Sequence, residues 1–168
     1  MNLSLGSGSK KGNVFAESLT VVIIILVFIV MIFMSHMIQN DMNDEIQADD
    51  DFTNETKELM QENTSRFPQY MDPLVVFLGV MLWITVIIAA LLIDTHPAFA
   101  VITFVLMIIT LIVSAMLANN FYEVLSEPEL VGLQSDFPIS MWVIENIVQM
   151  ILVMSITTGI ILYGKLKS

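Results

Sequence analysis

The strongest constraint on this chain is a set of four long apolar segments, at residues 18–40, 73–93, 98–118 and 141–164. The first three contain no charged residue, and the fourth contains only Glu145. A hydrocarbon layer about 30 Å thick needs roughly 20 apolar residues in a helix that rises about 1.5 Å per residue. The sequence therefore predicts four membrane-spanning segments.

These segments are rich in β-branched residues, which favour strands in water, but lipid offers no partner to unpaired backbone amides. A spanning segment must therefore be a helix or part of a closed barrel. Barrel strands alternate polar and apolar residues, and these segments do not. We therefore predict an all-α membrane protein, an antiparallel bundle of four transmembrane helices. The connections are too short for an independent core, so residues 1–168 are expected to form a single membrane domain.

The expected connections differ in character. Residues 1–17 are expected to form a flexible tail, and residues 41–72 and 119–140 to form acidic loops. Within the first loop, Phe52, Leu59 and Phe67 fall at helical spacing, so this segment is either a solvated loop or contains a short amphipathic helix capped by Asp50 or Asp51.

A four-residue turn is expected between the second and third helices. Asp94, His96 and Pro97 belong to this turn, in which Pro97 is suited to open the next helix. We expect the turn to hold the second and third helices in an antiparallel hairpin.

The distribution of charge predicts an orientation in the membrane. With four spans, both termini share a side, and this side carries four of the six basic residues. Cytoplasmic segments collect Lys and Arg, so both termini are predicted to be cytoplasmic. The formal net charge of −11 argues against direct binding of nucleic acid, which relies on basic surfaces.

The residues that usually carry chemistry are few. The chain has no cysteine, and its two histidines are expected on opposite faces of the membrane, with His36 ending the first helix and His96 in the turn. They cannot share a metal ion, so we expect interfacial or turn roles for both. No phosphate-binding loop or catalytic triad is present. The sequence predicts no enzyme, no cofactor and no metal site.

One polar cluster lies within a span. An acid inside a membrane is a functional hypothesis by default. Glu145, with Asn146 and Gln149 beside it, is expected either to lie at the membrane interface or pack against another helix, or to conduct a proton or cation. Small residues at a spacing of four, Ser114 with Ala118 and Ser155 with Gly159, predict close helix packing.

From residue 71 to residue 165 the chain resembles small multi-span membrane proteins of marine, lipid-containing, tailless icosahedral bacteriophages. The features that carry the resemblance are D-x-H-P at 94–97, N-x-Y-E at 120–123 and L-Y-G-K at 162–165. The resemblance implies a structural protein of the virion's internal membrane, or of the host cytoplasmic membrane before assembly. Such a subunit packs with copies of itself and contacts coat or vertex proteins.

Two other functions stay open. The polar cluster and the acidic loops are also compatible with a permeability protein, such as a holin-like protein or a small cation channel. The composition is equally compatible with an accessory subunit of a cellular membrane complex.

Overall fold

The computed structural model describes residues 14–92 and 97–167, which are almost entirely helical and contain no strand. In chain order, the elements are α1 (Val14–Ala48), α2 (Asn54–Leu92), α3 (Pro97–Leu125), the short α4 (Pro128–Val131), a 3₁₀ turn η1 (Gln134–Asp136) and α5 (Pro138–Lys167). The four long helices are each long and apolar enough to cross a membrane. The predicted all-α bundle of four spanning helices is confirmed.

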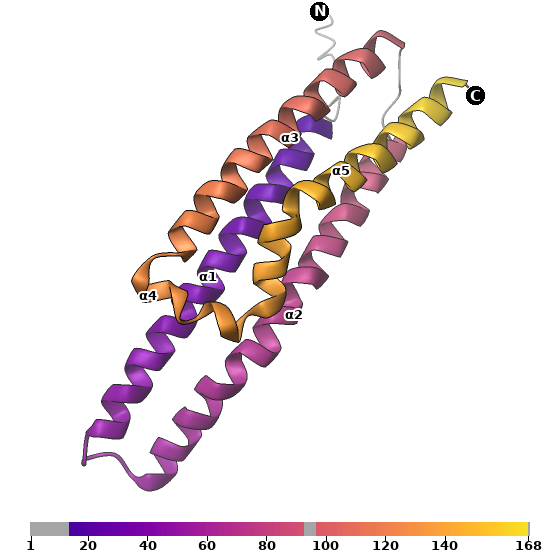
Figure 1. Cartoon of the computed structure of the whole chain (residues 1–168). Helices are drawn as coiled ribbons and strands as arrows, with labels where there is room; N and C mark the ends of the chain where they lie inside the picture. The colour runs from indigo at the N-terminus through magenta and orange to yellow at the C-terminus, as the bar shows by residue number, and fades with distance from the viewer. Residues whose placement is uncertain (1–13, 93–96, 168) are drawn as a thin grey trace, which may run out of the picture.

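The helices are arranged so that α1 and α5 each pack against both α2 and α3. α1 begins and α5 ends at the same end of the bundle (Figure 1).

Pro97 is the first residue of α3, whereas Asp94 and His96 lie outside the described residues. α2 and α3 run in opposite directions, as expected of a hairpin, but among the described residues each packs mainly against α1 and α5 (Figure 1). α2 and α3 occupy opposite corners of the bundle because α1 and α5 fill the space between them.

The core follows one face of α1 and one face of α5. Buried side chains on α1 recur every three or four residues, and they meet a similar row on α5; the set includes Val22, Leu26, Ile29, Phe33, Val143, Ile147 and Ile151. The opposite faces of both helices are also apolar but exposed, as a surface in contact with lipid acyl chains must be.

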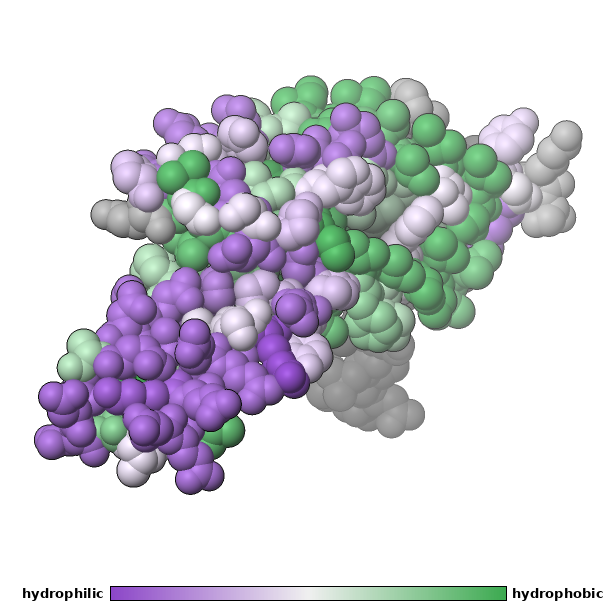
Figure 2. All heavy atoms as spheres, turned by 60° about the horizontal axis from the view of Figure 1, so that its bottom comes forward, coloured by the Kyte–Doolittle hydropathy of each residue, from purple (hydrophilic) through white to green (hydrophobic). Residues whose placement is uncertain are grey.

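The segment at residues 41–72, for which a solvated loop or a short amphipathic helix was expected, is instead made of two helical extensions and a turn. α1 has 35 residues and α2 has 39, so at about 1.5 Å per residue they measure about 52 Å and 58 Å, well beyond a hydrocarbon layer of about 30 Å. The excess lies at one end of the bundle, where both helices project together (Figure 1). We call residues 41–71 the acidic arm, because this segment carries nine acidic residues against Lys57 and Arg66. Its polar surface stands apart from the apolar body (Figure 2).

The tip of the acidic arm is closed by hydrogen bonds between its two helices. The Gln47 side-chain amide donates to the backbone carbonyl of Lys57 at 2.8 Å, and the Lys57 ammonium donates to the carbonyl of Gln47 at 3.1 Å. Thr53 caps α2, because its hydroxyl accepts a hydrogen bond from the backbone N–H of Thr56 at 3.3 Å. The expected caps, Asp50 and Asp51, instead lie within the turn.

The second acidic connection, residues 119–140, also differs from the expected loop. α3 continues to Leu125, and α4 and η1 fill much of the remainder before α5 begins. The Gln134 side-chain amide donates to the carbonyl of Leu125 at 2.7 Å, which folds η1 back toward the end of α3. This connection crosses the bundle where the acidic arm begins (Figure 1).

Candidate functional site

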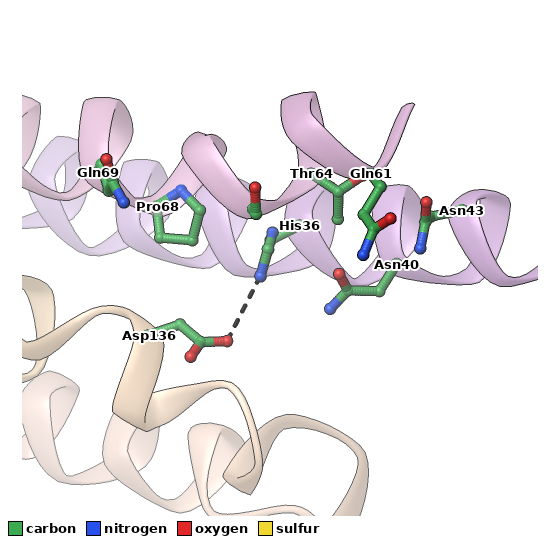
Figure 3. Close-up of a pocket in the computed structure, with 9 residues that line it drawn as sticks. His36, Asn40, Asn43, Gln61, Thr64, Pro68, Gln69 and Asp136 are labelled. Carbon is green, nitrogen blue, oxygen red and sulfur yellow. Dashed lines mark ion pairs between the residues drawn. The ribbon is translucent and has the colours of Figure 1, made fainter. Parts of the chain in front are cut away.

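A polar groove of about 500 Å³ lies at the base of the acidic arm, between α1 and α2 and beside η1. It is lined by polar side chains and one proline: His36, Asn40 and Asn43 from α1; Gln61, Thr64, Ser65, Pro68 and Gln69 from α2; and Asp136 from η1. Figure 3 shows Asp136 approaching His36 from the side opposite α2. We call this space the arm groove. It contains no lysine or arginine.

His36 is held between aromatic rings at one end of the groove. Its ring lies parallel to that of Phe67 with centroids 5.7 Å apart, and meets the Phe137 ring edge-on at 5.2 Å. Phe137 also contacts Phe33 at 4.8 Å, so the connection before α5 is packed against α1. His36 Nε2 lies 3.5 Å from Oδ2 of Asp136. His36 therefore joins α1, α2 and η1, rather than ending the first helix as the sequence suggested.

Several polar atoms of the groove are left without protein partners. His36 and Thr64 are only 4% and 6% exposed, yet His36 Nδ1 and Thr64 Oγ1 have no hydrogen-bond partner. Proline has no amide hydrogen, so Pro68 cannot donate to the Thr64 carbonyl, and Pro73 cannot donate to that of Gln69. Unpaired buried polar atoms are uncommon and costly, and the side chains of His36 and Thr64 line the groove from α1 and from α2.

Asp72 links α2 to the start of α5, next to the arm groove. Its side chain is 4% exposed and accepts three hydrogen bonds. The donors are the backbone N–H of Ile139 at 2.8 Å, the backbone N–H of Ser140 at 2.7 Å and the Ser140 hydroxyl at 2.6 Å. The first amides of a helix have no partner within the helix and attract negative charge, so Asp72 caps α5 from a different helix.

The polar cluster expected inside the fourth span divides between two environments. Asn146 is half-buried, and its amide donates to the Trp142 carbonyl in the same helix at 2.8 Å. Glu145 and Gln149 are exposed on the outside of α5 and bond to no other described residue. At about 1.5 Å per residue they lie about 8 Å and 14 Å along α5 from Ser140. Asn146 and Gln149 lie at the edge of an apolar groove of about 340 Å³ between α1, α2 and α5, whereas Glu145 does not line this groove.

The small residues also divide between two environments. Ser114 and Ala118 are buried on α3, whereas Ser155 and Gly159 on α5 are half-buried. A side chain added at Gly159 would meet no other atom within 4 Å. Only the α3 pair lies at a tight contact within this chain.

Sequence reasoning missed Asp72, Asp136 and Thr64. Asp72 was counted only as one charge of an acidic loop, although an acid directly before an apolar run and next to Pro73 was a usable signal of a capping role. Asp136 and Thr64 had no such signal, because their meeting with His36 depends on the paths of three separate elements.

The described residues contain no group of three or more His, Cys, Asp or Glu placed to hold a metal ion. Comparison with protein-family models, curated proteins and solved structures found no match. The arm groove, the Asp72 cap and the exposed polar face of α5 are therefore interpreted from their own geometry.

Proposed function

We propose that this integral membrane protein is a non-enzymatic structural subunit, which packs with copies of itself in the bilayer and holds the acidic arm outside it. The observation that carries the proposal is that Glu145 and Gln149 are exposed on α5 and bond to no other described residue. Polar groups facing hydrocarbon are costly, and a neighbouring helix that accepts their hydrogen bonds removes that cost. A second copy supplies the same groups around a twofold axis, because a carboxamide both donates and accepts.

The setting that we propose is the internal membrane of a virion, with coat or vertex proteins as further partners and both termini on the cytoplasmic side during synthesis. The sequence resemblance supports the virion, and the excess of lysines beside the termini supports the orientation. The acidic arm supports a role in binding a partner protein, because two paired helices that are joined by hydrogen bonds at their tip present a fixed surface. Purified particles that contain the chain in a constant ratio to the coat protein are the expected finding.

Cysteine cross-linking tests the self-association directly. The chain has no cysteine, so Gln149→Cys introduces a single thiol on the proposed contact face. We expect oxidation in membranes to yield a disulfide-linked dimer for Gln149→Cys. The matched control is Ile112→Cys on the exposed face of α3, which is expected to stay monomeric. Equal cross-linking of the two variants, or none at residue 149, would contradict the proposal.

A cation pathway is the second candidate, and the same observation favours it. If more than two copies meet through the polar face of α5, Glu145 and Gln149 line the common axis, as rings of acids do in cation channels. Expression would then cause conductance or lysis, and Glu145→Gln would abolish it. A structural subunit is expected to produce no conductance in planar bilayers with either residue at position 145.

A further inference from the structure

We propose that the arm groove binds a neutral polyhydroxylated group, of the kind presented by a sugar or by a lipid with a sugar headgroup. This inference goes beyond the structural role and does not depend on it. The groove of about 500 Å³ is large enough for a monosaccharide ring, and it lies at the base of the acidic arm, beside η1 and just before α5.

The side chains of the arm groove offer both hydrogen-bond donors and hydrogen-bond acceptors. Asn40, Gln61 and Gln69 each present a carboxamide with two N–H donors and one carbonyl acceptor, and none bonds to another described residue. The Thr64 hydroxyl both donates and accepts. A hydroxyl group of a ligand does the same, so several hydroxyls on one sugar ring match the donors and acceptors of these side chains.

His36 adds a hydrogen-bond acceptor that has no donor in the protein. Because Nε2 faces the Asp136 carboxylate at 3.5 Å, the proton of the neutral ring belongs on Nε2 and leaves a lone pair on Nδ1. Nδ1 is therefore an acceptor without a donor, and Pro68 and Pro73 give the carbonyls of Thr64 and Gln69 no helical amide donor. A ligand rich in O–H groups supplies these missing donors.

Charged ligands do not match the lining of the arm groove. An anion such as phosphate finds no basic side chain in the groove and is repelled by the nine acids of the arm. An organic cation is attracted by the arm but offers only donors, which would leave the carboxamide N–H groups unpaired. A metal ion would find Asp136 as its only carboxylate in the groove. A neutral polyhydroxylated ligand satisfies both sides of the hydrogen-bond balance.

The test uses the full chain in phosphatidylcholine nanodiscs, with methyl β-glucopyranoside as the probe and saturation-transfer NMR as the measurement. We expect transfer of saturation to the sugar ring protons. Thr64→Val keeps the side-chain shape and is expected to weaken binding about fivefold, as the loss of one hydrogen bond does. Gln61→Met, at an exposed position where folding is not at risk, is expected to have a similar effect.

The matched control is Thr85→Val in the same helix, because the Thr85 hydroxyl already donates to the Met81 carbonyl and lies outside the groove. It should bind the sugar as the unaltered chain does. A second experiment adds glucosyl diacylglycerol to the nanodiscs. If this lipid displaces the free sugar, the lipid headgroup is the ligand of the groove. If it does not, the ligand is a sugar from solution.

The proposal is overturned if neither the sugar nor the glycolipid binds, or if Gln61→Met and Thr64→Val bind as strongly as Thr85→Val. It is also overturned if spermidine or inorganic phosphate binds instead of the sugar, and if Gln61→Met and Thr64→Val weaken that binding.

Discussion

Asp72→Ala is expected to lower the free energy of unfolding by about 3 kcal/mol, since it leaves one buried and one partly buried backbone amide and one buried hydroxyl without an acceptor. The loss includes the favourable position of a carboxylate at the N-terminus of α5. Unfolding by sodium dodecyl sulfate in mixed micelles, followed by the fluorescence of the two tryptophans, measures the change.

Two further variants make this prediction specific. Asp51→Ala removes an exposed acid of the turn and is expected to change stability by less than about 0.5 kcal/mol. Ser140→Ala combined with Asp72→Ala is expected to cost less than the sum of the single changes, because both belong to one hydrogen-bond network. Strict additivity, or equal effects of Asp72→Ala and Asp51→Ala, would show that Asp72 does not cap α5.

Phe137→Ala is expected to cost about 3–5 kcal/mol, the range for removing a large buried aromatic side chain. Phe137 is 0% exposed and contacts both Phe33 and His36, so its removal opens a cavity where η1 meets α1. Hydrogen exchange at residues 126–140 should rise together with the loss of stability, because this connection loses its main apolar anchor.

The control for this substitution is Phe77→Ala. Phe77 is 62% exposed on α2, where acyl chains replace the missing ring, so we expect only a small effect. Phe137→Leu, which keeps most of the apolar volume, should recover most of the stability. Similar losses for Phe137→Ala and Phe77→Ala would contradict the anchoring role.

The secondary structure within the bilayer was predictable because hydrogen-bond satisfaction in lipid permits few alternatives. The length of the helices was not. The sequence of the acidic arm is polar and strongly charged, features that also describe a loop, and its helical state depends on the pairing of α1 with α2. The Gln47–Lys57 contacts and the Thr53 cap belong to that pairing.

At the candidate sites, too, the sequence predicted which residues matter but not how they are oriented. Glu145 and Gln149 were recognisable because polar residues are rare within a span, but their outward direction was not. In water, the buried face of a helix is marked by apolar residues opposite polar ones. Here the faces toward lipid and toward the core are both apolar, so the pattern alone does not distinguish them.

The sequence by itself determined that lipid surrounds most of this chain and that four helices cross it, because segments of this length and composition satisfy their backbone only in that form. The tertiary structure decided which helices are neighbours, which face of α5 is left open, and how Asp72 and His36 find partners 67 and 100 residues away. Those outcomes depend on side-chain shape and on contacts between distant segments, which composition and periodicity do not encode.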